Sequence, residues 1–158
     1  MDSVQAMFSH KVVKEMEGED TVTAILRYRN GAMGRLLVSW GILNPPSMPW
    51  FAVYGDQGVI YEVPGKRWGF HHRPRLELTT KINVYSVKLP GYHAPGGKTI
   101  ELPAANPFME EINHFIDCVL TGKQPKMTGE IARKDLEIVL AIYKSAENGK
   151  TVKLPLRY

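Results

Sequence analysis

The chain has 158 residues, of which 44% are hydrophobic and 23% are charged, as expected for a soluble globular domain of ordinary size. Its net charge is +4, but the basic residues are scattered among acidic ones, so they form no basic stripe for nucleic acid. No apolar run approaches the ~20 residues needed to span a bilayer. We therefore expect no nucleic-acid partner and no membrane partner.

Cysteine usage and the first residues both bear on the cellular compartment. Cys118 is the single cysteine of the chain, so an internal disulfide cannot form. Residues 1–5 lack the basic and apolar segments of a signal peptide, and none is expected. This pattern is typical of a protein in the reducing cytoplasm, and we expect a cytoplasmic location.

The first half of the chain predicts β-strands. In residues 21–28, Val22, Ala24, Leu26 and Tyr28 alternate with mainly polar side chains, and residues 33–40 return with the same period. Between them lies Asn30-Gly31, a dipeptide typical of tight hairpin turns because both turn residues need positive φ. Residues 4–13 alternate more weakly and are expected to form an edge or neighbouring strand.

A second strand–turn–strand unit is predicted at residues 50–54 and 59–63, because a glycine-rich turn separates two short apolar runs. Residues 75–80 and 82–89 form two further candidate strands. Residues 90–97 are rich in proline and glycine and are expected to form a loop.

A first helix is predicted from its end signals and its apolar period. Asn106 suits the N-cap, Pro107 suits the first helical position, and Gly122 suits the C-terminal end. Helical spacing gathers a stripe of apolar residues that we expect to be buried, namely Phe108, Ile112, Phe115, Ile116 and Val119.

A second helix is predicted from Thr128, which suits the N-cap, to Gly149, which suits the end. A short strand is expected at residues 151–154. The expected buried face of this helix comprises Ala132, Leu136, Val139, Leu140, Tyr143 and Ala146.

These elements predict an α+β fold, in which an open-faced, mostly antiparallel sheet of about six strands has two C-terminal helices on one face. The uncovered face must then be polar or meet a partner. We expect a homo-oligomer, in the simplest case a dimer, that forms through this open sheet face. Four aromatic residues are assigned to the core or the interface rather than to a cofactor site: Trp40, Trp50, Phe51 and Tyr54.

The middle of the chain holds the candidate site residues. Trp68, His71, Tyr92 and His93 lie in segments rich in glycine and proline, and loops on a rigid sheet commonly carry ligand contacts. We interpret them as candidates for binding a sugar or polyol; the alternative is that they are surface-loop residues or cover an open edge of the core. Their histidines, with His72, lack the spacing of a metal site, so no metal is expected.

Three stretches of the sequence resemble the GFO/IDH/MocA oxidoreductases, the glucose–fructose oxidoreductase and inositol dehydrogenase family. The two-helix tail is the best match, at residues 106–125 (NPFMEEINHFIDCVLTGKQP), 128–138 (TGEIARKDLEI) and 141–155 (AIYKSAENGKTVKLP). Residues 19–34 (EDTVTAILRYRNGAMG) and 53–60 (VYGDQGVI) are similar to the strands that precede it in the family. The resemblance implies a domain that follows a nucleotide-binding Rossmann domain, supplies part of the substrate pocket and often packs its sheet against another subunit.

Two departures from the family pattern limit what the resemblance implies here. The sequence has no Gly-x-Gly-x-x-Gly fingerprint for a dinucleotide, so we expect this chain to bind no cofactor itself. It also lacks the family's Glu-Lys-Pro motif and its Asp-x-Gly-x-His-x-x-Asp stretch, so no catalytic residue is assigned.

The resemblance therefore suggests that residues 1–158 are a single C-terminal substrate-binding and oligomerisation domain, without the N-terminal Rossmann domain. The full-length enzyme would be an NAD- or NADP-dependent oxidoreductase that acts on a sugar or cyclitol-like alcohol, and this chain alone would be inactive. The alternative is a standalone, non-catalytic module of the same fold that dimerises or binds a small molecule.

Overall fold

A computed structural model of the chain describes residues 1–42, 49–63, 81–103 and 106–157. The chain divides into two compact units, which are described separately. The first unit combines Met1–Asn44 with Gln124–Tyr158, and the second unit comprises Pro45–Lys123. The strand predicted at residues 75–80 lies outside the described residues.

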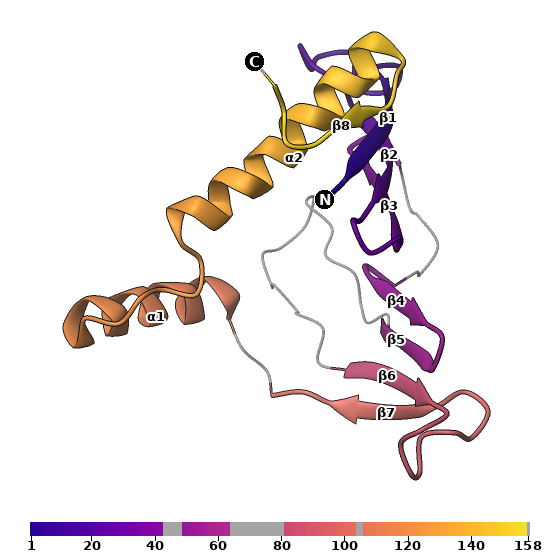
Figure 1. Cartoon of the computed structure of the whole chain (residues 1–158), viewed down its shortest axis with the longest axis vertical. Helices are drawn as coiled ribbons and strands as arrows, with labels where there is room; N and C mark the ends of the chain where they lie inside the picture. The colour runs from indigo at the N-terminus through magenta and orange to yellow at the C-terminus, as the bar shows by residue number, and fades with distance from the viewer. Residues whose placement is uncertain (43–48, 64–80, 104–105, 158) are drawn as a thin grey trace. The chain divides into compact units, whose positions relative to one another are not determined.

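The first unit is built on a four-stranded antiparallel sheet in the order β3-β2-β1-β8 (Figure 1). Its strands are β1 (Ser3–Ser9), β2 (Thr21–Arg27), β3 (Met33–Ser39) and β8 (Val152–Lys153). The weakly alternating first segment therefore forms an inner strand, since β1 pairs with β2 on one side and with β8 on the other. The C-terminal end of the chain thus completes the sheet beside its first strand.

The hairpin between β2 and β3 turns at Asn30-Gly31, as the sequence predicts. The Tyr28 N–H donates to the Ala32 carbonyl at 2.9 Å, and the Gly31 N–H donates to the Tyr28 carbonyl at 3.0 Å. Gly31 has a φ of 88°, a left-handed conformation that glycine adopts without strain. The turn prediction is confirmed.

Helix α2 (Gly129–Asn148) packs against one face of this sheet, alongside β1 and β8 (Figure 1). Thr128 caps its start by accepting a hydrogen bond from the Ile131 N–H, and Gly149 ends it with a φ of 64°. The core between helix and sheet consists of buried residues from three elements. They are Val4, Ala6, Ala24, Ala141 and Ile142.

The buried face of α2 differs from the prediction. Ala141, Ile142 and Ser145 are the buried residues of this helix, and Ile138 packs beside them. Most of the predicted stripe is instead exposed, because small residues at the contact let the helix approach β1 closely along a different face. Of the predicted residues, Ala146 packs against the core, whereas Leu136, Val139 and Leu140 are exposed.

Tyr143, another member of the predicted stripe, makes contacts at the edge of the core. Its ring meets the ring of Phe8 edge-on, with centroids 4.9 Å apart. Its hydroxyl donates to Glu19 Oε1 at 2.6 Å, and this hydrogen bond is the main cause that raises the pKa of Tyr143. Tyr143 therefore links α2 to the segment between β1 and β2.

That segment is also held by Asp20, which is buried with 1% of its surface exposed. Its Oδ2 accepts hydrogen bonds from the N–H groups of Lys11, Val12 and Val13 at 2.8, 2.6 and 3.0 Å. Hydrogen bonds lower the pKa of the Asp20 carboxyl from 3.8 to about 2. The bonds from the Val12 and Val13 N–H groups lower this pKa most, and those from Thr21 and Lys11 have smaller effects. Together they outweigh burial, which raises the pKa.

Replacing Asp20 with asparagine is expected to lower the melting temperature at neutral pH by several degrees, because the ionised carboxylate is the form that the three N–H groups stabilise. Since the folded pKa is depressed, this stabilisation is complete above pH 3.8 and is lost as the pH falls through about 2. Thermal melts across this range should show a steeper acid loss in the wild type than in Asp20→Asn. Glu17→Gln, at an exposed acid of the same segment, is the matched control, and equal profiles for Asp20→Asn and the wild type would contradict the assignment.

The second unit contains another four-stranded antiparallel sheet, in the order β4-β5-β6-β7. Its strands are β4 (Ala52–Gly55), β5 (Gly58–Glu62), β6 (Lys81–Ser86) and β7 (Lys98–Glu101). The predicted strand–turn–strand unit is confirmed by β4 and β5, and the strand predicted at residues 82–89 is confirmed by β6, which ends earlier, at Ser86. Strand β7 was not predicted from the sequence.

Helix α1 (Pro107–Thr121) also belongs to the second unit, and its predicted ends are confirmed. The Asn106 side chain accepts from the Phe108 and Met109 N–H groups at 3.1 and 3.3 Å, and Gly122 ends the helix with a φ of 68°. The predicted burial of its apolar stripe is wrong for this unit. The buried residue of α1 is instead Cys118. The whole stripe is exposed: Phe108, Ile112, Phe115, Ile116 and Val119.

The α+β class, the antiparallel pairing, the open sheets and the C-terminal helices are confirmed. The strands in the described part of the chain number eight, divided between two sheets of four.

The face of the first sheet opposite α2 exposes Met7, Ile25, Met33 and Leu37, and we call it the open face. Neither described helix combines the length and apolar character needed to cross a bilayer.

Candidate functional site

Two of the four predicted site residues are described by the structure. Tyr92 and His93 lie in the connection between β6 and β7, whereas Trp68 and His71 lie outside the described residues. Tyr92 is half-buried and His93 is exposed. The β6–β7 connection therefore places an aromatic ring and an imidazole side by side in sequence on one loop.

Backbone hydrogen bonds and the ammonium group of Lys98 hold Tyr92 in this loop. Its carbonyl accepts from the Ser86 N–H and its own N–H donates to the Leu89 carbonyl, both at 3.1 Å. The Lys98 Nζ lies 5.2 Å from the centroid of the Tyr92 ring, within the range of a cation–π interaction. An aromatic face beside an ammonium group and an exposed imidazole can contact both the apolar face and the hydroxyl groups of a polyol.

A buried polar network that the sequence analysis missed supports the same loop. Asn83 on β6 is 5% exposed, and its Nδ2 donates to Tyr61 Oη at 2.6 Å and to the Gly96 carbonyl. Its Oδ1 accepts from Thr99 Oγ1 at 3.3 Å. Asn83 therefore ties the loop at Gly96 to β5 and β7. The one signal in the sequence was an asparagine between the apolar residues Ile82 and Val84.

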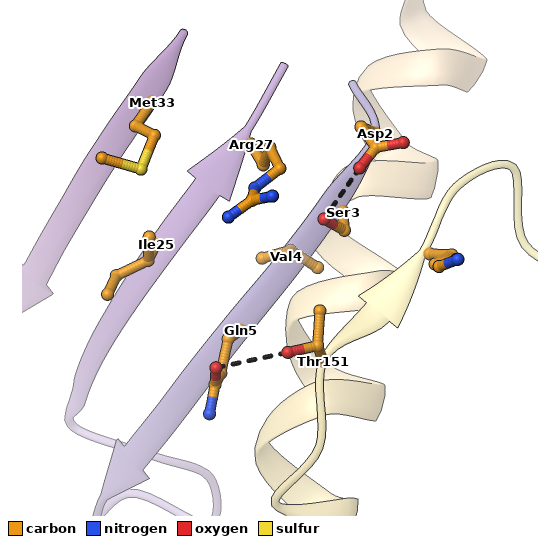
Figure 2. A pocket seen from close by; sticks show the side chains of 9 residues that line it. Asp2, Ser3, Val4, Gln5, Ile25, Arg27, Met33 and Thr151 are labelled. Carbon is orange, nitrogen blue, oxygen red and sulfur yellow. Dashed lines mark hydrogen bonds between the residues drawn. The ribbon is translucent and has the colours of Figure 1, made fainter. Parts of the chain in front are cut away.

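The first unit has a separate hollow on its open face, with a volume of about 450 Å³ (Figure 2). It lies over one end of β1, where β1 meets β2 on one side and β8 on the other. The residues that line it are Asp2, Ser3, Val4, Gln5, Ile25, Arg27, Met33, Thr151 and Lys153.

Side-chain hydrogen bonds cross the floor of this hollow. The Thr151 hydroxyl donates to Gln5 Oε1 at 3.2 Å, and the Ser3 hydroxyl donates to Asp2 Oδ2 at 3.1 Å (Figure 2). This hollow could not be predicted from the sequence, because its walls come from both ends of the chain. Strand alternation alone could have placed Ser3 and Gln5 on one face, but not beside Thr151.

Neither unit assembles an obvious catalytic or metal centre from its described residues. Groups of three or more metal-ligating side chains are not found in the described part of the chain. The Cys118 Sγ lies 3.7 Å from His114 Nε2, one turn apart on α1, and Cys118 is buried. A pair of side chains provides too few ligands for a closed zinc site.

Comparison with known families identifies the domain. The model of an oxidoreductase family, C-terminal alpha/beta domain, matches residues 1–154. The chain belongs to the GFO/IDH/MocA oxidoreductase family. The match includes β1, β2 and β3, all four strands of the second unit, both helices and β8.

Solved structures share the fold of this GFO/IDH/MocA domain at low sequence identity. The aldose–aldose oxidoreductase from Caulobacter crescentus, complexed with glycerol, is 22% identical with a TM-score of 0.70, over 97% of this chain and 41% of that chain. The WlbA dehydrogenase from Bordetella pertussis, in complex with NADH and UDP-GlcNAcA, is 23% identical with a TM-score of 0.62, over 99% and 39%. An NAD-binding oxidoreductase from Klebsiella pneumoniae is 16% identical with a TM-score of 0.74, over 99% and 46%.

The GFO/IDH/MocA chain described here spans less than half the length of these three solved proteins, at 39% to 46% of each. At identities of 16% to 23%, these likenesses establish a shared fold. The binding of NADH or of a sugar nucleotide is a property of those proteins.

Proposed function

We propose that residues 1–158 serve as the C-terminal substrate-binding and oligomerisation domain of an NAD- or NADP-dependent oxidoreductase. The whole enzyme would transfer a hydride between the nicotinamide and a carbon that bears a hydroxyl group on a sugar or cyclitol-like alcohol. The observation that carries the proposal is the family match over residues 1–154. Complexes of structural relatives with NADH and a nucleotide sugar support the cofactor and substrate classes.

In this proposal the dinucleotide binds to a Rossmann domain outside residues 1–158, because the sequence has no Gly-x-Gly-x-x-Gly fingerprint. The chain alone is then catalytically inactive. Its single cysteine is consistent with an enzyme of the reducing cytoplasm, where we place it.

The sugar would contact the β6–β7 loop, where Tyr92 and His93 lie, together with Trp68 and His71. Support comes from the half-buried Tyr92 ring beside the Lys98 ammonium group and from the anchoring of the loop by Asn83. Aromatic rings can cover the apolar face of a sugar while polar side chains bond its hydroxyl groups.

The open face of the first sheet would form the contact between two copies of the enzyme. It exposes Met7, Ile25, Met33 and Leu37 on a single side of the sheet. Apolar side chains gathered on one exposed face commonly mark a contact surface in a soluble protein. Sedimentation of a monomer at high protein concentration would contradict this part of the proposal.

The test of the function uses the natural polypeptide that contains residues 1–158. It should be screened with sugars and cyclitols in the presence of NAD⁺ or NADP⁺, with NAD(P)H absorbance as the readout. We expect reduction of one cofactor by a polyhydroxylated substrate, and no NADH binding by the 158-residue chain alone. NADH binding by this chain, or a natural polypeptide of the same length without activity, would favour the standalone binding module instead.

Once a substrate is known, Tyr92→Ala and His93→Ala should each raise its KM about tenfold, as the loss of a contact worth about 1.4 kcal/mol would do. Lys88→Ala, at an exposed residue of the same loop, is the matched control and should leave KM unchanged. If all three variants behaved alike, the loop would not contact the substrate.

A further inference from the structure

The connection between β6 and β7 has two halves, and the first half is held by Ser86 at the end of β6. The Ser86 Oγ accepts hydrogen bonds from the N–H groups of Lys88 and Leu89, both at 3.2 Å. The Ser86 N–H donates to the Tyr92 carbonyl at 3.1 Å. These contacts close the first half on itself, but they do not reach the second half, which begins at His93.

The second half ends in a turn at Gly96-Gly97 that lies close to β6. Both glycines are left-handed, with φ of 87° and 72°, and the Gly97 N–H donates to the Ala94 carbonyl at 2.9 Å. A Cβ atom on Gly97 would lie 2.5 Å from the Val84 carbonyl oxygen, so a side chain cannot be accommodated there. The turn places the Gly96 carbonyl against the Asn83 side chain, whose Nδ2 donates to it.

The amide of Asn83 is oriented by the two strands on either side of it. In the register of the sheet, Asn83 lies opposite Tyr61 on β5 and opposite Thr99 on β7. The Tyr61 hydroxyl accepts one N–H of the amide, and the Thr99 hydroxyl donates to its oxygen. The amide nitrogen is therefore left to face Gly96. Because a carbonyl oxygen can only accept hydrogen bonds, a carboxylate in place of this amide would leave the Gly96 carbonyl without a donor.

We propose that Asn83 is a positioning residue of the substrate site, which fixes the second half of the loop so that Tyr92 and His93 are held ready for the substrate. The inference rests on the proposed function, in which these two residues contact the sugar. The Gly96-Gly97 turn leads directly into Lys98, whose Nζ lies 5.2 Å from the centroid of the Tyr92 ring, so the same anchor also places this cation. A loop that is ordered before binding loses less conformational freedom when the substrate binds, which lowers KM.

Asn83→Asp tests this role in the natural polypeptide that contains residues 1–158, with the sugar or cyclitol that the screen identifies. It keeps the size of the side chain and the acceptor for Thr99, but it removes the donor to the Gly96 carbonyl. We expect KM to rise about tenfold while kcat stays within about twofold, because Asn83 is buried and would act on the substrate only through the loop. Val84→Ala is the matched control, at a buried residue on the opposite face of the same strand, and should leave KM unchanged. An equal rise of KM in both variants would overturn the proposal, since any loss of packing in β6 would then suffice.

Amide hydrogen exchange at Tyr92 and Gly97 tests the anchoring in the same polypeptide without any substrate. We expect exchange about tenfold faster in Asn83→Asp than in the wild type, and no such change in Val84→Ala. Unchanged exchange in Asn83→Asp would overturn the anchoring whether or not the enzyme is active.

Gly97→Ala disturbs the same turn while leaving the Asn83 amide in place, so it should also raise KM, and it serves as the test if Asn83→Asp does not fold. The positioning role fails, and the proposed function stands, if Tyr92→Ala raises KM but neither Asn83→Asp nor Gly97→Ala does. If none of these variants changes KM, the contact between the loop and the substrate is itself wrong. A wild type without turnover would overturn the proposed function, and the exchange at Gly97 would still decide whether Asn83 anchors the loop.

Discussion

Replacing Ile142 with alanine is expected to lower the free energy of unfolding of the first unit by about 2–5 kcal/mol. Ile142 is 6% exposed and packs in the core that α2 shares with β1 and β2. Truncation removes buried methyl and methylene groups and leaves a cavity that the sheet can refill only in part. Urea denaturation followed by far-UV circular dichroism measures the change, because α2 is the longest helix of the described residues.

Leu140→Ala is the matched control for Ile142→Ala on the same helix. Leu140 is 43% exposed, so its truncation should cost about 1 kcal/mol or less. The two substitutions together distinguish the observed face of α2 from the face that the sequence pattern predicted. If Leu140→Ala were the more costly change, the helix would pack through its leucine stripe and the assigned core would be wrong.

Features that depend on neighbours in the sequence could be predicted. The Asn30-Gly31 turn and the caps at Asn106 and Thr128 follow from local backbone conformation and from hydrogen bonds within a few residues. Their chemistry is complete within a single turn or a single helix end. This is why the hairpin and the ends of both helices agree with the structure.

Features that depend on distant contacts could not be predicted from the same patterns. Helix α2 has apolar residues on more than one side, and its larger stripe is not the one that packs on the sheet. Contact with β1 selects the side that carries Ala141 and Ser145, whose small side chains permit close approach. The inner position of β1 likewise depends on β8, which lies at the other end of the chain.

The candidate sites divide in the same way. Tyr92 and His93 could be proposed from the composition of their loop, and their contact with substrate stays a prediction. The anchoring of that loop by Asn83, by contrast, requires the register of three strands. The hollow that places Arg27 and Lys153 on either side of Ser3 requires strands that are more than a hundred residues apart in the sequence. Sequence patterns can thus indicate a candidate binding loop, but not a surface assembled from distant strands.

A hydrogen bond between α2 and β1 is the second distant contact whose loss should have a large effect on stability. Ser145 on α2 is fully buried, and its Oγ accepts the Ala6 N–H at 2.9 Å and donates to the Lys150 carbonyl at 2.7 Å. The ladder between β1 and β8 includes Ser3 and Val4 and ends before Ala6. The serine hydroxyl therefore provides Ala6 with the acceptor that a longer β8 would have supplied.

Ser145→Ala should lower the free energy of unfolding by about 1–3 kcal/mol, because it leaves a buried N–H and a carbonyl without their partner. Glu147→Ala, at an exposed position of the same helix, is the control and should change it by no more than about 0.5 kcal/mol. Amide hydrogen exchange at Ala6 separates the lost hydrogen bond from a general loss of stability. If exchange at Ala6 accelerated no more than exchange at Val4, the hydroxyl would contribute by packing alone and the proposed completion of β1 would be wrong.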